Sequence, residues 1–245
     1  MTPGVATTIP WEDPSRGVLA RFWATVSGAT TDPVGTFTRI GAAEGERDLS
    51  SGVSFALLTA AVGWAPFVLL SPCLAVVPFA FGSSLPDDLR AIGTGAMCGM
   101  VGAMPFVLLL GSVGVELVHA VIFHGIAALL GGVGDFRRSF HAMLYTSAIR
   151  FWLLPALFLG FVPFVGSMVH LGVRMAFVIW AGFACYGAAR GAHGLDDQRA
   201  LVVAILTPLV SIGIVSFCIA ALVFALVLAF AGSLGLGGVL PGVFR

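Results

Sequence analysis

The chain has 245 residues, of which 58% are hydrophobic and only 10% are charged, and its formal net charge is zero. Because a soluble domain carries about 25% charged residues, this composition excludes an ordinary soluble protein and indicates a membrane protein with several helical spans. The balanced charge also excludes nucleic acid as an expected partner.

Residues 1–52 are the most polar part of the chain, and we expect them to form a cytoplasmic tail with short amphipathic helices. Within residues 14–29, apolar side chains recur at helical spacing: Val18, Phe22 and Val26, with Leu19 and Trp23 alongside. Such a stripe suits either a helix lying in the membrane interface or a helix packed on the cytoplasmic ends of the spans. Asp32-Pro33 is typical of the start of a second short helix.

Residues 53–235 are expected to form a five-span membrane domain, followed by a short tail, 236–245. Apolar stretches that could cross a hydrocarbon core of about 30 Å lie at about 53–82, 91–130, 140–160, 164–188 and 201–231. In the first stretch, Pro66, Pro72 and Pro78 predict kinks or a broken entry near residues 64–66. We interpret 91–130 as one long span kinked near Pro105, with two spans as the alternative. The predicted fold class is an all-α, polytopic membrane helical bundle.

The arginines predict the orientation of this bundle, since all twelve basic residues are Arg. With five spans and a cytoplasmic N-terminus, the cytoplasmic segments contain Arg16, Arg21, Arg39, Arg47, Arg137, Arg138, Arg190 and Arg199. The outside segments contain only Arg90 and Arg245. This bias follows the positive-inside rule, so we expect the N-terminus in the cytoplasm and the C-terminus outside.

A candidate polar network lies within the predicted spans: Glu116, His119, Arg150, His170 and Arg174. A charge at mid-membrane costs about 2.5–3.5 kcal/mol on insertion scales, so it normally faces the protein interior and has a partner. At 1.5 Å per helical residue, Glu116 and both arginines lie about 18–24 Å from the cytoplasmic ends of their spans. We expect a structural ion pair of Glu116 with Arg174 first and Arg150 second, with His119 sharing the network. The alternative is a proton or ion relay that includes His170.

Two cytoplasmic loops are candidate partner-binding loops. Their residues are Gly131, Gly132, Gly134, Phe136, Arg137 and Arg138 in the first loop, and His193, Asp196 and Asp197 in the second. A plainer interpretation is that both are tight turns whose glycines supply positive φ. The two aspartates beside His193 are more typical of a solvated helix start than of a metal site.

No catalytic, cofactor or metal site is predicted. Glu116-x-x-His119 has the spacing of di-metal helical bundles, but that chemistry needs a second such motif and two more Glu. Gly187-x-x-x-Gly191 permits close contact between helices, and it is better evidence for internal packing than for dimerisation.

From His124 to Pro208, the order of motifs resembles the YIP membrane domain (Ypt/Rab-interacting protein family) in its bacterial members. The motifs are His124, LLGGVGDFRRSFHAMLY, the hairpin FVPFVGS and AHGLDDQRALVVAILTP, and Pro10-Trp11-Glu12 and Asp32-Pro33-x-x-x-Phe37 are similar too. Arg150 and Arg174 depart from the pattern, and the eukaryotic Asp-Leu-Tyr-Gly-Pro signature is missing, so Rab binding is not carried over. The resemblance implies five spans, a cytoplasmic N-terminus in the bacterial inner membrane, no enzymatic activity and a role in membrane organisation.

Two functions follow from these patterns. The first is a non-enzymatic scaffold or organiser, whose partners would be the lipid bilayer, an unidentified membrane or cytoplasmic protein and a second copy of the chain. The alternative is a small transporter or channel with a polar mid-membrane site around Glu116 and Arg174.

Overall fold

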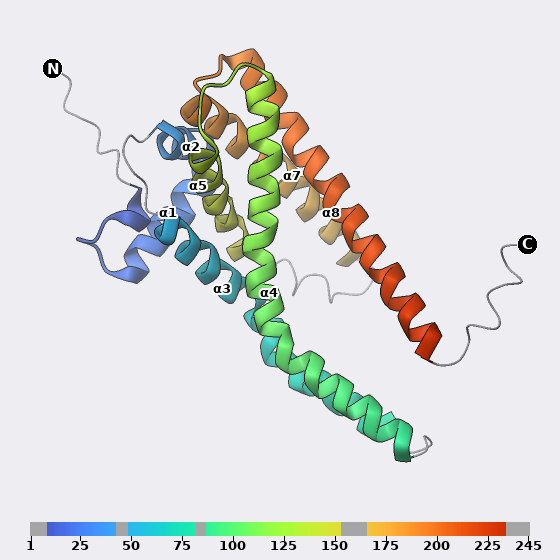
Figure 1. Ribbon diagram of the computed structural model, residues 1–245. Helices are drawn as coiled ribbons and strands as arrows, with labels where there is room; N and C mark the ends of the chain where they lie inside the picture. Colours follow the sequence, from blue (N-terminus) through green and yellow to red (C-terminus); the bar gives the residue numbers. More distant parts are fainter. Residues whose placement is uncertain (1–8, 43–48, 82–86, 153–165, 234–245) are drawn as a thin grey trace, which may run out of the picture.

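The computed structural model describes residues 9–42, 49–81, 87–152 and 166–233, and every regular element within these ranges is a helix (Figure 1). The elements are η1 (Pro10–Glu12), α1 (Val18–Thr31), α2 (Pro33–Ala42), α3 (Leu49–Phe81), α4 (Asp87–Leu129), α5 (Phe136–Thr146), η3 (Ser147–Trp152), α7 (Gly166–His193) and α8 (Asp197–Ser233). This is the all-α class predicted from the composition.

In the described part of the chain, four segments are long and apolar enough to cross a membrane: Leu49–Pro66, Gly102–Leu129, Leu171–His193 and Asp197–Leu226. They lie in α3, α4, α7 and α8, which correspond to four of the five predicted spans. The remaining predicted span, 140–160, overlaps the end of α5 and η3 and then enters residues 153–165, outside the described residues. The count of five therefore stays a prediction.

The two long helices α3 and α4 pack against each other and account for the first half of the membrane domain. Residues 91–129 lie within a single helix, as predicted for this stretch, with Pro105 in its interior, and α4 changes direction along its length (Figure 1). Of the two alternatives predicted near residues 64–66, the broken entry is wrong, because α3 continues as one helix through Pro66, Pro72 and Pro78. The kinks stay a prediction. A proline removes one backbone donor, but neighbouring helices allow a membrane helix to continue through it.

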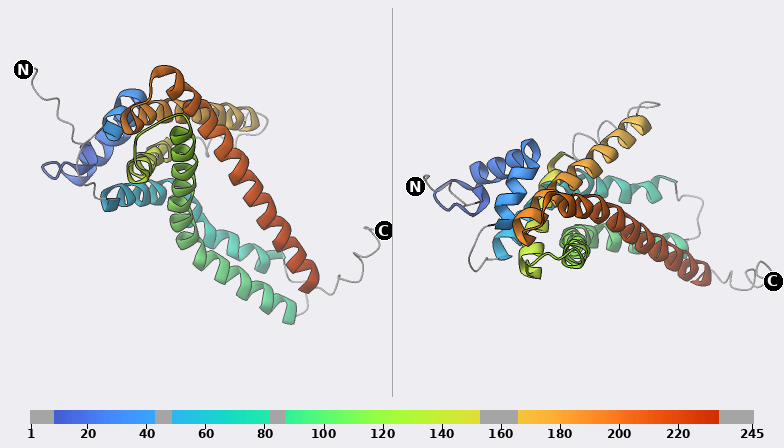
Figure 2. Two further views of the ribbon diagram at one scale, coloured as in Figure 1. Left: turned by 45° about the horizontal axis from the view of Figure 1, so that its top comes forward. Right: turned by 90° about the horizontal axis from the view of Figure 1, so that it is seen from above.

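The N-terminal helices pack against the ends of the long helices (Figure 2). In α1, Phe22 and Val26 are buried, and the Phe22 ring lies 5.9 Å from that of Phe55 on α3. Leu19 and Trp23, at the edge of this stripe, remain exposed, although the Trp23 ring also lies 5.7 Å from that of Phe151. The sequence left open whether this helix packs on the bundle or faces the membrane interface. The structure shows the packing and leaves these apolar side chains exposed.

Helix α2 starts as the Asp32-Pro33 pair predicts, since the Asp32 carboxylate accepts a hydrogen bond from the Gly35 backbone N–H at 2.9 Å. It then packs closely on α7 through the predicted Gly187-x-x-x-Gly191 motif. A Cβ added at Gly191 would lie 2.2 Å from the Thr38 carbonyl oxygen, and one at Gly187 would lie 2.4 Å from the Val34 oxygen. These glycines therefore serve internal packing, because only a residue without Cβ permits this backbone contact.

The packed core lies at one end of the molecule, where α1, α2 and α5 meet the ends of α3, α4, α7 and α8 (Figures 1 and 2). Its largest fully buried side chains include Tyr145, Phe37, Phe55 and Phe123. Beyond this core, α4 and α8 expose apolar side chains such as Phe106, Leu110 and Phe217. A membrane helix can leave such residues exposed, since the bilayer core is itself apolar.

Candidate functional site: a loop junction and an interior ion pair

The two predicted partner loops meet at the core end of the molecule. We call this contact the loop junction, and it joins the α4–α5 loop (residues 130–135) to the end of α7 and the α7–α8 turn (residues 192–196). The Val133 backbone N–H donates to the His193 carbonyl oxygen at 3.2 Å, and the Arg199 guanidinium donates to the Leu130 carbonyl oxygen at 3.2 Å. The topology had placed both loops on one side, and here they are in direct contact.

The glycines of this junction have two different physical roles. Gly131 and Gly194 have φ values of +87° and +63°, the left-handed conformation that ends helices α4 and α7. Gly132 and Gly134 instead permit close approach: a Cβ would lie 2.8 Å from the His193 ring at the first and 2.1 Å from the Ala192 oxygen at the second. The interpretation of these glycines as tight-turn residues with positive φ is thus correct for Gly131 and Gly194. Gly132 and Gly134 instead allow the two loops to come into contact.

Aspartates begin the helices on the far side of each loop. Asp135 accepts from the Arg138 backbone N–H at 2.7 Å, and Asp196 accepts from the Arg199 backbone N–H at 2.9 Å. The interpretation of Asp196 as a helix start is therefore confirmed. Asp197, the first residue of α8, accepts from the Tyr186 hydroxyl at 3.0 Å.

A cluster of one serine and two histidines stabilises the loop junction from the interior of the protein. The Ser139 hydroxyl oxygen lies 2.8 Å from His193 Nε2 and 3.2 Å from His124 Nδ1. His193 is only 1% exposed, so it lies beneath the surface rather than on it as a partner-contact residue would. The sequence did not indicate Ser139, because nothing in the sequence around it distinguishes a serine that hydrogen-bonds two histidines from any other serine on a helix.

The outer surface of the junction exposes apolar side chains among charges. Leu129 and Val133 are 88% and 90% exposed, and Phe136 is 38% exposed. Arg137, on α5, and Asp196, in the α7–α8 turn, are also exposed. We call these five residues the junction surface. Leu129 ends a candidate span, whereas Val133 and Phe136 lie outside the candidate spans, and exposed apolar side chains of this kind are typical of an interaction site when they gather in one place.

The interior polar network is centred on Glu116, which is 3% exposed. Arg150 Nη2 lies 2.5 Å from Glu116 Oε1. The Thr146 hydroxyl donates to Oε2 at 2.9 Å, and His119 Nδ1 lies 3.4 Å from the same oxygen. An ion pair of Glu116 with Arg150 thus forms within the bundle, with His119 as a neighbour and with Thr146 as a partner that the sequence did not indicate.

The expected order of the two arginines is wrong: Arg150 pairs with Glu116, whereas Arg174 is exposed on α7. Depth along a helix places a residue at a level in the membrane but does not say which face of the helix it occupies. Arg150 reaches Glu116 because η3 follows directly on α5, which packs against α4. The side chain of His170 lies outside the described residues.

A third polar contact fixes the N-terminal segment, and sequence reasoning missed it. Glu12 Oε1 accepts from the Tyr145 hydroxyl at 2.9 Å and from the Ser51 hydroxyl at 3.0 Å, and His141 Nε2 lies 2.8 Å away. Burial raises the pKa of Glu12, but the hydrogen bond and charge of His141, with the two hydroxyl donors, lower it overall below the ordinary 4.5. The only signal was Pro10-Trp11-Glu12, noted as part of the family resemblance.

Within the described ranges, no group of three or more His, Cys, Asp or Glu side chains is arranged to hold a metal ion. The Glu116-x-x-His119 spacing is accounted for by the ion pair just described.

Comparison with known proteins gives one result. The family model of the Yip1 domain matches residues 28–220, which include both loops of the junction and well over half of the chain. No curated protein and no solved structure matches the chain significantly.

Proposed function

Since this chain belongs to the Yip1 domain family, we propose that it is a non-enzymatic membrane scaffold or organiser, which acts through contacts with the bilayer and with a partner protein. The observation that supports this function best is the junction surface. Glycine packing and the Ser139–His193 contact fix its shape from inside. A rigid surface that mixes exposed apolar groups with charges suits recognition of another protein, because little ordering entropy is lost on binding.

The bilayer contact would come from α1. Its exposed apolar residues Val18, Leu19 and Trp23 follow Arg16 and lie at the N-terminal end and along one edge of the face that packs on the bundle. A helix with Trp and Leu exposed along one side and Arg nearby suits the interfacial layer of a membrane.

The proposed orientation places the N-terminus and the junction in the cytoplasm of a bacterial inner membrane, with the C-terminus outside. The structure supports a common side for these segments, since α2 packs on α7 and the α4–α5 loop contacts His193. The arginines of α1, α2, α5 and the α7–α8 region therefore share one end of the molecule, as the positive-inside rule requires of a cytoplasmic face.

The alternative, a small transporter or channel around Glu116 and Arg174, is less well supported. Both Glu116 oxygens already have partners within the chain, in Arg150, Thr146 and His119. Arg174 is exposed on another helix. A carboxylate satisfied in this way is suited to joining helices, because a transport site must exchange its ligands with a passing solute.

Site-specific photocrosslinking in native membranes tests the scaffold function. A photoreactive residue at Val133 should give a reproducible crosslink to one identified protein. One at Leu206, an exposed position within the α8 span, should not. Adding Arg137→Glu should remove the Val133 crosslink, because it reverses the charge of the proposed partner surface. If Val133 crosslinks only to lipid, or Arg137→Glu leaves the crosslink unchanged, the proposed partner surface is wrong.

A further inference from the structure

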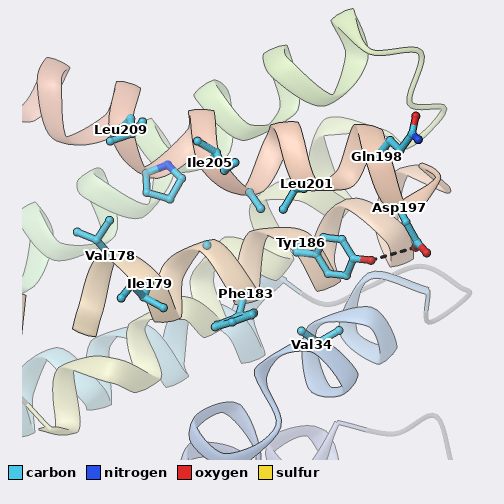
Figure 3. A pocket seen from close by; sticks show the side chains of 13 residues that line it. Val34, Val178, Ile179, Phe183, Tyr186, Asp197, Gln198, Leu201, Ile205 and Leu209 are labelled. Atoms are coloured by element: carbon cyan, nitrogen blue, oxygen red, sulfur yellow. Dashed lines mark hydrogen bonds between the residues drawn. The ribbon is translucent and has the colours of Figure 1, made fainter. Parts of the chain in front are cut away.

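A groove of about 650 Å³ lies between α7 and α8, and its polar end adjoins the α7–α8 turn (Figure 3). Its walls are apolar: Val178, Ile179 and Phe183 come from α7, and Leu201, Ile205 and Leu209 come from α8. Phe183, Ile205 and Leu209 are 52–56% exposed, so the groove opens outward from two membrane-spanning helices. Neither the polar network nor the loop junction accounts for it.

One end of this groove is polar. There the Tyr186 hydroxyl donates to Asp197 at 3.0 Å, and Gln198 lies beside them (Figure 3). Arg190 stands next to this end, with its Nε 3.3 Å from the Asp197 carboxylate. Arg190 and Asp197 are about half and three quarters exposed, so both retain positions for further hydrogen bonds. Tyrosine and arginine at this position are typical of the membrane–water interface.

The length of the groove fits one leaflet. From Asp197 at the polar end to Leu209 at the apolar end, twelve helical steps span about 18 Å. Half of the hydrocarbon core is about 15 Å. The groove therefore runs from the level of the lipid headgroups to near the middle of the bilayer.

The chemistry of the groove favours an occupant with a charged head and an apolar chain, because the walls are apolar and one end is polar. The neighbouring opposite charges at the mouth match a headgroup that carries both charges: Arg190 suits a phosphate and Asp197 an ammonium group.

We infer that this groove binds one phospholipid with a zwitterionic, amine-containing headgroup. One acyl chain lies between α7 and α8, the phosphate meets Arg190, and the ammonium group meets Asp197. Through this site the protein would bind one lipid specifically, in addition to lying in the bilayer. The inference does not depend on the scaffold function.

Native mass spectrometry of the delipidated full-length protein tests this site, with palmitoyl-oleoyl phosphatidylethanolamine and phosphatidylglycerol as probes. The wild type should retain one phosphatidylethanolamine, with affinity at least about fivefold above that for phosphatidylglycerol, roughly 1 kcal/mol. Ile205→Trp fills the groove and should lower phosphatidylethanolamine occupancy at least about fivefold, again near 1 kcal/mol. Ile212→Trp is the matched control, since Ile212 is similarly exposed on α8 but does not line the groove. Arg190→Gln should abolish the headgroup preference.

A second measurement does not rely on the folding of a variant. Phosphatidylethanolamine with a photoreactive acyl chain should label wild-type peptides that contain residues 178–183 and 201–209. Equal lipid occupancy in Ile205→Trp and wild type overturns the site, and so does labelling spread evenly along α8. Equal binding of the two lipids overturns the headgroup assignment, and crosslinking of the groove to a second protein chain overturns the lipid occupant.

Discussion

Glu116→Gln should destabilise the protein strongly because it leaves Arg150 without its counter-charge. Arg150 is only 13% exposed on its side chain, and Glu116 is 3% exposed. Breaking a buried ion pair by removing one partner costs about 3–5 kcal/mol. In a protein of this size, 1 kcal/mol shifts the melting temperature by about 2–4 °C, so the expected loss is about 6–20 °C.

Thermal unfolding in detergent, followed by tryptophan fluorescence, measures this shift. Two further variants separate the pair from other causes. Arg174→Gln should not show this loss, because Arg150 and not Arg174 pairs with Glu116. The double variant Glu116→Gln/Arg150→Met should recover most of the loss, because replacing both partners of a buried pair is often neutral. If Glu116→Gln melts like the wild type, or Arg174→Gln loses as much, the assignment of Arg150 as the partner is refuted.

Two other predictions concern the packing of the N-terminal region. Gly191→Ala should lower stability by about 1–3 kcal/mol through overpacking, because its Cβ would lie 2.2 Å from the Thr38 carbonyl oxygen. Gly172→Ala is the control on the same helix: its Cβ would meet nothing within 4 Å, so it should be neutral in the same melting assay. Because the pKa of Glu12 is below 4.5 in the fold, its stabilisation is complete above about pH 4.5 and is lost as the pH falls through the folded pKa. The protection factor of the η1 amides, which is the intrinsic exchange rate at a given pH divided by the measured rate, should fall on acidification in the wild type. Glu12→Gln should show a low protection factor at both pH values, and a pH-independent protection factor in the wild type would contradict this linkage.

Features that depend on neighbouring residues could be predicted from the sequence. The apolar stretches correspond to α3, α4, α7 and α8. Asp32 and Asp196 begin their helices, and the Gly187-x-x-x-Gly191 spacing marks a close helix contact. Each is decided by the chemistry of a few adjacent residues, so each is visible without the fold.

Features that depend on distant residues could not be predicted in this way. Glu12 and His141 are 129 residues apart in the sequence, and Glu12 and Tyr145 are 133 apart. The choice between Arg150 and Arg174 required knowing which face of each helix turns inward. The segment 136–152 was predicted mainly as part of a span, but α5 instead buries polar side chains such as Ser139 and His141 within the core.

Cysteine accessibility in intact bacterial cells tests most directly whether the N-terminal helices and the loop junction share the cytoplasmic face. In a cysteine-free background, single cysteines replace Leu19, Val133 or Arg245 and are treated with a membrane-impermeant maleimide. The account predicts that Leu19→Cys and Val133→Cys react only after the membrane is permeabilised, and that Arg245→Cys reacts in intact cells. Labelling of Leu19→Cys and Val133→Cys from opposite faces would contradict the shared surface, and protection of Arg245→Cys in intact cells would contradict an odd number of spans.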